Sequence, residues 1–178
     1  MNQPTNALAL TRPLLRVLQW LNGLYGLAIA GLVTFCFLRP GFIYAALKVE
    51  PGPLASRVAT ALLLVAMLGV VGAVLVHFVL RHLRAMVETV RAGDPFVADN
   101  ARRLQAIAWL VMAGEFVRLG VGVVGRIAAP IARELGIHVD RNLVQFSLTP
   151  WLCVLLLFVL AGVFAHGTRL RDDLEGTV

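Results

Sequence analysis

The chain has 178 residues, of which 59% are hydrophobic and 15% charged, and its mean hydropathy is +0.82. Soluble domains are roughly half apolar and about a quarter charged, so this composition excludes a soluble globular domain and an intrinsically disordered chain. Two cysteines cannot form a disulfide scaffold, and the length favours a single domain. The sequence therefore predicts a small all-α integral membrane protein.

Four apolar stretches are long enough to cross about 30 Å of hydrocarbon, which takes roughly 20 helical residues. Helices are expected because unpaired backbone groups are too costly in lipid. The first stretch is too long for a signal peptide and is not followed by a small-residue cleavage site, so we expect a retained anchor. The prediction is one four-transmembrane-helix bundle over residues 1–178, with spans at about 14–38, 58–80, 104–127 and 149–168.

The distribution of lysine and arginine predicts how these spans are oriented. Of the 16 basic residues, nine flank the start of span one, lie between spans two and three, or follow span four. Five lie in the other two loops, and two lie in or at the end of span three. Because cytoplasmic loops carry the excess of basic residues, both termini are predicted to be cytoplasmic, together with a hairpin at 81–103 and a tail at 169–178. The net charge of +6 follows from this topology, so direct nucleic-acid binding is not expected.

Small residues four positions apart predict where the spans pack, because close backbone approach replaces the hydrophobic force between helices in lipid. Spans one, two and four contain one such pair each, and span three is the richest in glycine. The residues are Gly26 and Ala30, Gly69 and Ala73, Ala161 and Ala165, and then Gly120, Gly122 and Gly125.

Glu115 and Arg118 form the charged pair expected near the middle of the bilayer. They lie three residues apart, so they share one helix face and can form an ion pair. A lone charge at that depth costs about 3 kcal/mol or more, so the pair should face protein or water. Two interpretations stay open: a self-neutralising pair that locks the bundle, or part of a pathway or site for an ion, a proton or a polar ligand.

No cofactor and no enzymatic chemistry are predicted. The sequence contains no cluster with metal-ligand spacing, no phosphate-binding loop and no nucleophile elbow. His77 and His166 lie near the cytoplasmic ends of two spans and are candidate haem ligands, although an interfacial position is the commoner role of such histidines. Cys36 and Cys153 are expected to be two small buried hydrophobic residues rather than a bridge.

The second helix is predicted to continue into the cytoplasm as an amphipathic extension. Its polar side carries Arg84, Glu88 and Arg91, where Glu88 can pair with either arginine. Two roles stay open for this extension, which either rests on the lipid surface or offers a docking surface to a cytoplasmic partner. Its apolar side is formed at helical spacing by Leu83, Met86, Val87 and Val90.

The turn of the hairpin is predicted at Gly93-Asp94-Pro95, because glycine and proline end helices. Asp99 or Asn100 is expected to cap the following helix. Phe96, directly after the turn, is either a plug between the second and third helices or an anchor for a partner. The acidic residues of the tail, which can pair with the basic hairpin, are Asp172, Asp173 and Glu175.

Two motifs stand out in these cytoplasmic segments. The hairpin contains Gly93-Asp94-Pro95-Phe96, then Asn100 and Arg103-Leu104, and the chain ends with Phe164, Gly167, Leu170, Asp172, Asp173, Glu175, Thr177 and Val178 at matching spacing. With these motifs the chain resembles an uncharacterised bacterial family of four-span membrane proteins (domain of unknown function 2975 type). Members often carry a Gly-Asx-Pro-Phe turn followed by Asn and Arg-Leu, and they tend to end in Phe-x-x-Gly-x-x-Leu, an acidic stretch and Thr-Val.

The resemblance implies a multi-pass protein of the bacterial cytoplasmic (inner) membrane. Genes for such proteins often lie beside the gene for a small Cro/C1-type helix-turn-helix regulator, which implies a regulatory pair. Where members usually have a charged residue between the Phe and the Gly, this chain has His166, which weighs further against haem. Glu115 and Arg118 belong to no pattern of the family.

We therefore expect a non-enzymatic membrane protein whose hairpin and tail dock a partner, with such a transcriptional regulator as the candidate. The alternative is a small transporter or channel built around Glu115 and Arg118, which would have to be a homo-oligomer because four spans enclose little space. The residues expected to bind the partner are Gly93, Asp94, Pro95, Phe96, Asn100, Arg103, Gly167, Leu170, Asp172 and Asp173.

Overall fold

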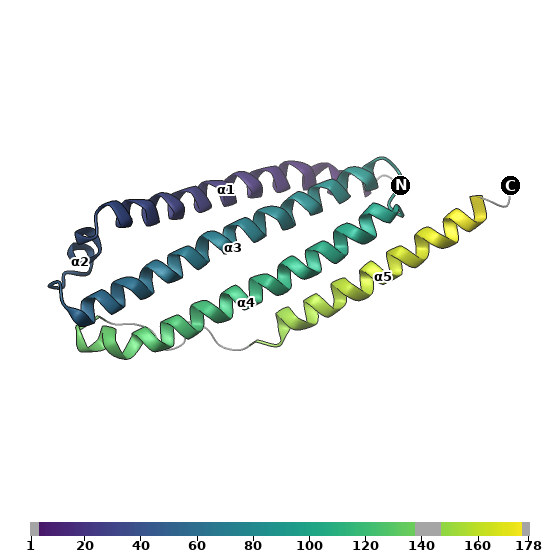
Figure 1. The fold of residues 1–178 in the computed structure, drawn as a ribbon. Coiled ribbons are helices and arrows are strands. Elements are labelled where there is room, and N and C mark those ends of the chain that lie inside the picture. The colour runs from purple at the N-terminus through teal and green to yellow at the C-terminus, as the bar shows by residue number, and fades with distance from the viewer. Residues whose placement is uncertain (1–3, 138–146, 176–178) are drawn as a thin grey trace. The chain divides into compact units, whose positions relative to one another are not determined.

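The computed structural model describes the backbone of residues 4–137 and 147–175, and the side chains of residues 11–137 and 147–171. These residues contain no strand, and the chain forms five helices (Figure 1): α1 (Pro4–Leu38), α2 (Gly41–Leu47), α3 (Pro53–Arg91), α4 (Ala98–Glu134) and α5 (Thr149–Glu175). All but α2 are long and apolar enough to cross a membrane. The predicted all-α fold with four membrane spans is therefore confirmed.

Large apolar side chains cover the outside of these helices. Trp20, Leu38 and Leu27, all on α1, are 78%, 74% and 71% exposed. Contact with water would forfeit about 1.5–3 kcal/mol for each side chain of this size, whereas contact with lipid would not. The apolar exterior is what a multi-pass membrane protein requires.

The long helices extend beyond the predicted spans. α1 begins at Pro4 rather than near residue 14, and α4 ends at Glu134 rather than near residue 127. α3 runs without interruption to Arg91, which confirms the predicted extension of the second helix, and α5 continues through most of the predicted tail. Hydropathy marks only the part of a helix that suits lipid, whereas the main-chain hydrogen bonds continue into the polar region.

The chain forms two compact units, and α1, α3 and α4 each contribute residues to both. The hairpin unit comprises Met1–Asn22, Leu75–Gly114 and Ser147–Val178, and the small-residue unit comprises Gly23–Val74 and Glu115–Phe146. The predicted turn and tail belong to the hairpin unit, whereas the Glu115 and Arg118 pair belongs to the small-residue unit. The two sets of candidate residues are thus held by different packing.

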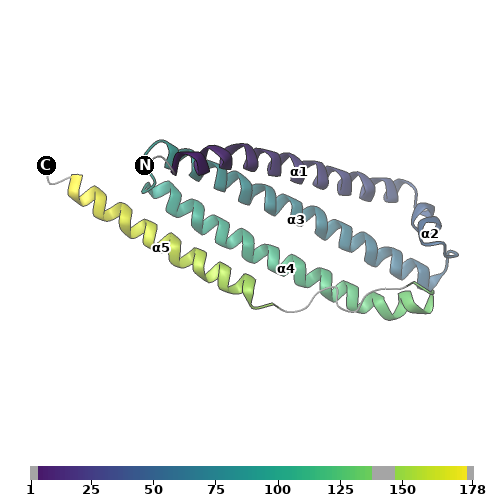
Figure 2. The same ribbon diagram turned by 180° about the vertical axis from the view of Figure 1, so that it is seen from behind.

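The short helix α2, in the small-residue unit, was not predicted from the sequence. Figure 2 shows it at the bend between α1 and α3. Its Ile43 is buried together with Cys36 of α1 and Ala59 of α3, and the ring of Phe42 meets that of Phe35 edge-on at 5.0 Å. Seven residues are too few for a helical period to be recognised in a sequence, and only the packing stabilises so short a helix.

Close approach of small residues holds the small-residue unit together, as predicted. A Cβ atom built on Gly26 would lie 3.1 Å from the Cβ atom of Ala73, and one built on Gly120 would lie 3.5 Å from Leu68. Gly69 faces Ile29 in the same way at 3.6 Å. The predicted packing stripes of spans one, two and three are therefore contact faces.

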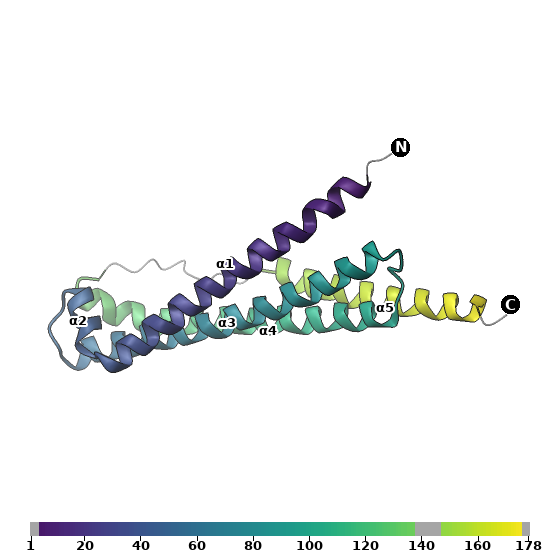
Figure 3. The same cartoon turned by 90° about the horizontal axis from the view of Figure 1, so that it is seen from above.

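In the hairpin unit, the chain passes from α3 to α4 through a short turn (Figure 3). The end of α3 forms a Schellman motif: the amide of Asp94 donates to the carbonyl of Thr89 at 3.2 Å, and the amide of Gly93 donates to that of Val90 at 3.2 Å. Gly93 has φ +85°, a left-handed conformation that glycine adopts without steric cost. The predicted break at Gly93 is confirmed.

Candidate functional site

A hydrogen-bond network centred on Asn100 fixes the hairpin turn. The side chain of Asn100 is completely buried, and its amide nitrogen donates to Thr89 Oγ1 of α3 at 2.7 Å and to the carbonyl of Pro95 at 2.9 Å. Thr89 in turn donates to the carbonyl of Met86 at 2.8 Å. A buried amide that lacked these partners would cost about 1–3 kcal/mol, so the turn is restricted to a geometry that satisfies it.

Arg103 extends this network across the hairpin. Its Nη1 atom donates to Asn100 Oδ1 at 2.9 Å and to the carbonyl of Ala85 on α3 at 3.3 Å. Charge-assisted hydrogen bonds of this kind are among the stronger ones in proteins. Asn100 and Arg103 therefore tie α4 to α3, and their three-residue spacing places both side chains toward the turn and α3.

The prediction that Asp99 or Asn100 caps α4 is wrong. The helix begins at Ala98, before both residues, and the side chain of Asn100 points into the hairpin instead of closing the helix. Asp99 lies in the first helical turn, where it pairs with Arg102 at 3.2 Å. Asparagine is a common cap, but here both hydrogen bonds donated by its side-chain amide go to Thr89 and to the carbonyl of Pro95.

Phe96 packs against α5, a contact that neither of its two predicted roles included. Its ring lies 5.3 Å from that of Phe164, and a Cβ atom on Gly167 would lie only 3.2 Å from the Phe96 ring. The absence of a side chain at Gly167 thus makes room for Phe96. Because Phe96 remains 45% exposed, its other face is available for contact.

Arg171 of α5 forms an ion pair with Asp94 of the turn. This contact has the opposite polarity to the predicted one, because the tail supplies the cation and the hairpin supplies the acid. The side chains of Asp172 and Asp173, which were expected to pair with the hairpin, lie outside the described residues. We call the contacts of Asp94, Phe96, Gly167 and Arg171 the turn–tail junction.

The polar side of the α3 extension packs on α1 through polar contacts. Glu88 pairs with Arg12 of α1 at 3.1 Å, and Arg84 donates to Gln19 Oε1 at 3.4 Å. The sequence had predicted Arg84 or Arg91 as the partner of Glu88. Both belong to the same helix as Glu88, because helical spacing shows only which residues of one helix lie close together. The partner comes instead from α1, whose extension on the N-terminal side of the first span was not predicted.

Leu170 completes the exposed surface of the hairpin unit near the junction. It lies three residues beyond Gly167, so the two residues lie on neighbouring positions of one helix face. Its side chain is 53% exposed. Arg91, at the end of α3, is exposed and forms no ion pair with any described side chain. Phe96, Leu170 and Arg91 are therefore the exposed side chains of the hairpin unit that could contact another molecule.

In the small-residue unit, Glu115 and Arg118 form the predicted ion pair. The Nε atom of Arg118 donates to a carboxylate oxygen of Glu115 at 2.8 Å. The Glu115 side chain is 12% exposed and that of Arg118 33%, so the carboxylate is the more enclosed partner. Such a pair neutralises itself within one helix, near the middle of α4.

The remaining candidates are not brought together in the interior. His77 and His166 are both exposed, whereas axial haem ligands lie inside a cofactor pocket, and His77 meets Phe78 edge-on at 6.2 Å. Among the described residues there is no group of three or more His, Cys, Asp or Glu side chains that could hold a metal. Both cysteines are free thiols, Cys36 buried and Cys153 exposed, so the expectation that both are buried holds for Cys36 alone.

Sequence reasoning found most residues of the site but not their contacts. Thr89, Gln19 and Arg12 were missed, because nothing in a single sequence shows which polar residue will contact a side chain of another helix. The one available signal was that both motifs contain a phenylalanine and a glycine. In the structure, Phe96 of the first motif contacts Gly167 of the second.

Comparison with known proteins agrees with the resemblance of the two motifs. A family model described as a protein of unknown function (DUF2975) matches residues 8–178. The match covers all four long helices, the hairpin turn and the end of the chain. No curated protein and no solved structure matches the chain.

Proposed function

This chain belongs to the DUF2975 family of proteins of unknown function, and we propose that it is a non-enzymatic membrane protein that docks a cytoplasmic partner protein through its hairpin turn and tail. The candidate partner is a small helix-turn-helix transcriptional regulator of the kind that the family resemblance implies. In this proposal the protein lies in the bacterial inner membrane with both termini in the cytoplasm. The turn–tail junction is the observation that carries the proposal.

The junction supports docking because it makes one rigid surface from two distant segments. Asp94 and Phe96 belong to the turn, whereas Gly167 and Arg171 lie more than seventy residues further along the chain. Asn100 holds the turn by donating a hydrogen bond to the carbonyl of Pro95, and Arg103 in turn holds Asn100. A preorganised surface loses little conformational entropy when a partner binds, which favours affinity.

The side chains left exposed by this framework are suited to protein contact. Phe96 and Leu170 are about half exposed at the polar end of the helices. Aromatic residues near the centre of an interface often dominate its binding energy. Arg91, at the end of α3, is also exposed, and its charge favours a partner with an acidic surface.

The positive charge of this end of the molecule supports the cytoplasmic placement. Arg81, Arg91, Arg102 and Arg169 are exposed near the turn and the end of α5. Such an excess of arginine is typical of the cytoplasmic side of multi-pass proteins. A partner that binds DNA must be cytoplasmic, so this orientation is a requirement of the proposal.

The test is co-purification of the full-length chain with a Cro/C1-type regulator of the same organism, in detergent micelles. Phe96→Ala and Leu170→Ala are each expected to weaken the complex at least tenfold, as for truncated interface aromatics and anchors. Phe78→Ala is the matched control, because Phe78 is 41% exposed in the same unit but lies on the membrane part of α3. A fluorescent reporter active only in the cytoplasm, fused after Val178, checks the orientation.

Stability of the variants separates docking from folding. Phe96→Ala should lower the free energy of unfolding by only about 1 kcal/mol, below the roughly 3–5 kcal/mol of a fully buried phenylalanine, because half of the ring is already exposed. Retention of the complex by both docking variants, with a folded protein and a cytoplasmic reporter, would overturn the proposal.

A further inference from the structure

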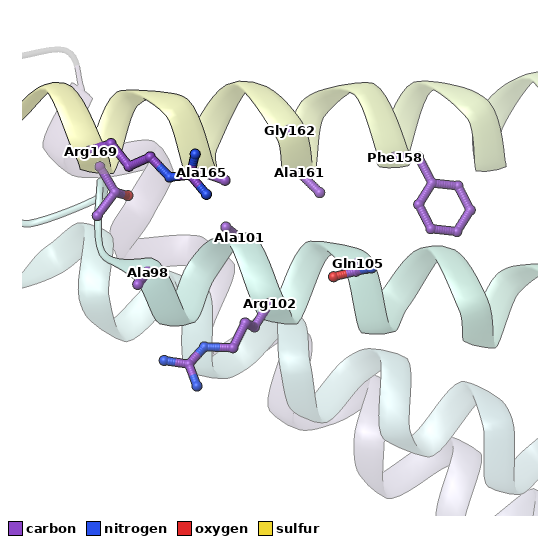
Figure 4. A pocket seen from close by; sticks show the side chains of 10 residues that line it. Ala98, Ala101, Arg102, Gln105, Phe158, Ala161, Gly162, Ala165 and Arg169 are labelled. Carbon is purple, nitrogen blue, oxygen red and sulfur yellow. The ribbon is translucent and has the colours of Figure 1, made fainter.

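Within the hairpin unit, a groove of about 470 Å³ lies between α4 and α5. This volume falls within the range of about 300–1,000 Å³ that is typical of small-molecule sites. Small residues of α5, namely Ala161, Gly162 and Ala165, form one wall, and Ala98 and Ala101 of α4 lie opposite (Figure 4). The lack of bulky side chains on both helices keeps the space open.

One end of the groove is cationic. Arg169, near the end of α5, and Arg102, in the second turn of α4, both line it. Figure 4 shows the Arg169 side chain lying along α5 above Ala165, whereas the Arg102 side chain leaves α4 on the side away from α5. Asp99 holds Arg102 at 3.2 Å, and this pair is largely exposed, with side chains 77% and 61% accessible for Arg102 and Asp99.

Toward its other end the groove is lined by the polar side chain of Gln105 on α4 and then by an aromatic ring (Figure 4). This ring belongs to Phe158, and it meets that of Trp109 edge-on at 5.4 Å. Phe158 and Arg169 are eleven positions apart on α5, or roughly 16 Å at a rise of 1.5 Å per residue. That length is about half of the roughly 30 Å hydrocarbon thickness of a bilayer. The groove therefore has the reach of one leaflet, with its charge at the helix ends.

We propose that this groove binds one anionic phospholipid, with the phosphate at Arg169 and Arg102 and an acyl chain along the small residues toward Phe158. The cationic end selects the charge of the headgroup, because basic pockets between transmembrane helices are typical sites for anionic lipids. The largely apolar length favours a lipid over a free phosphate compound, which would fill only the end beside the arginines. The site goes beyond partner docking, and it depends on neither the partner nor the orientation of the chain.

The two arginines are expected to contribute unequally. Arg169 forms no ion pair with any described side chain and lies at the groove wall, whereas Arg102 must leave Asp99 to reach a phosphate. Arg169 is therefore the principal ligand of the headgroup, and Arg102 is the second.

Trp109 provides a reporter at the aromatic end of the groove. The full-length protein with Trp20→Phe and Trp151→Phe retains Trp109 as its only tryptophan. It is reconstituted in vesicles of increasing mole fraction of phosphatidylglycerol or phosphatidylcholine with brominated acyl chains, which quench nearby tryptophan. Brominated phosphatidylglycerol is expected to quench Trp109 half-maximally at a mole fraction at least about fivefold lower than brominated phosphatidylcholine, the factor associated with one arginine near an anionic headgroup.

Variants with matched controls locate the selectivity. Arg169→Gln should abolish most of the preference and Arg102→Gln less of it, whereas Arg81→Gln, an exposed arginine that does not line the groove, should leave it unchanged. Gly162→Leu should fill the groove and remove the preference, because a Cβ atom there meets nothing within 4 Å and the helix can accept it. Gly31→Leu is its control, since Gly31 is equally open but lies on α1.

Three results would overturn the proposal. The first is equal quenching by the two brominated lipids in the parent protein. The second is an unchanged preference in both Arg169→Gln and Gly162→Leu, each folded by circular dichroism. The third is relief of the quenching by millimolar glycerol 3-phosphate, which would identify the occupant as a soluble phosphate compound.

Discussion

The two units of this protein are stabilised by different chemistry. In the hairpin unit, polar side chains from separate elements are bonded to one another: Asn100 to Thr89, Arg12 to Glu88, and Arg171 to Asp94. In the small-residue unit, apolar side chains and small residues make the contacts between helices, with the closest approach at Gly26 and Ala73, and the one ion pair between described side chains, Glu115 with Arg118, lies within a single helix.

We attribute the difference to the surroundings of these contacts, since the polar contacts of the hairpin unit lie at the turn and near the helix ends. In lipid, apolar side chains gain nothing by leaving the solvent, so helices associate through close packing. At the polar end, water competes for every hydrogen bond, and a turn needs several bonds to keep one geometry. The geometry of the hairpin unit thus depends on hydrogen bonds and ion pairs between specific side chains, whereas that of the small-residue unit depends on how closely its helices can pack.

The largest effect is expected where the ion pair of the small-residue unit is broken. Glu115→Gln removes the carboxylate to which Arg118 donates, at a position where the acid is nearly buried. We expect a loss of about 2–3 kcal/mol in the free energy of unfolding, reduced from the buried-pair range because a third of the Arg118 side chain is exposed. Unfolding in mixed micelles by titration with a denaturing detergent measures the change.

The double variant Glu115→Gln with Arg118→Met is the control. It should recover most of the loss, since a buried pair roughly breaks even against apolar replacement. An unchanged stability in the single variant would show that the pair does not lock α4. Loss of an ion flux across vesicles by a folded double variant would instead favour the transporter alternative.

The second effect concerns the network that fixes the hairpin turn. Asn100→Ala leaves the carbonyl of Pro95 and the half-buried hydroxyl of Thr89 without their donor, and we expect a loss of about 2 kcal/mol in the free energy of unfolding. Asp99→Ala, one residue away and exposed, should cost less than about 1 kcal/mol. Equal losses for the two variants, in the same detergent titration, would contradict the idea that the hairpin unit depends on specific partners.

The third effect tests packing by shape with two glycines of α1. Gly26→Ala places a methyl group 3.1 Å from the Ala73 side chain, so we expect a loss of about 1 kcal/mol from overpacking. Gly31→Ala meets nothing within 4 Å and should be neutral or stabilise by up to about 1 kcal/mol, because alanine is the better helix former. The opposite signs of these changes, read from thermal unfolding by circular dichroism, are the diagnostic result. A gain for both variants would mean that α1 and α3 are not in close contact.

The smallest effect is expected at the ion pair of the turn–tail junction. Asp94 and Arg171 are 39% and 44% exposed, and pairs of this kind contribute only about 0–1 kcal/mol. A double-mutant cycle with Asp94→Asn and Arg171→Gln should give a coupling energy in that range, which falls further at high salt. A coupling energy well above 1 kcal/mol would show that this pair stabilises the fold as strongly as the buried network at Asn100, which an exposed ion pair should not do.

The sequence alone was sufficient for the fold class and for most of the residues that matter. Length, hydropathy and the required hydrogen bonding of a chain in lipid leave little choice besides four long helices. The break at Gly93 and the pair at Glu115 and Arg118 were also predictable, because both depend on residues a few positions apart. The family motifs selected Phe96, Asn100 and Gly167 without indicating what each contacts.

Only the tertiary structure decided those contacts. The spacing along a helix predicts which residues share a face, but it does not say which other element lies opposite. For this reason the helical spacing paired Glu88 with arginines of its own helix rather than with Arg12. It likewise left Phe96 as either a plug or a partner anchor, without its contact to Gly167, and offered Asn100 as a possible helix cap rather than as a partner of Thr89. The groove between α4 and α5 was equally out of reach, because open space arises from the distance between two helices, and that distance is set by packing rather than by any local pattern of residues.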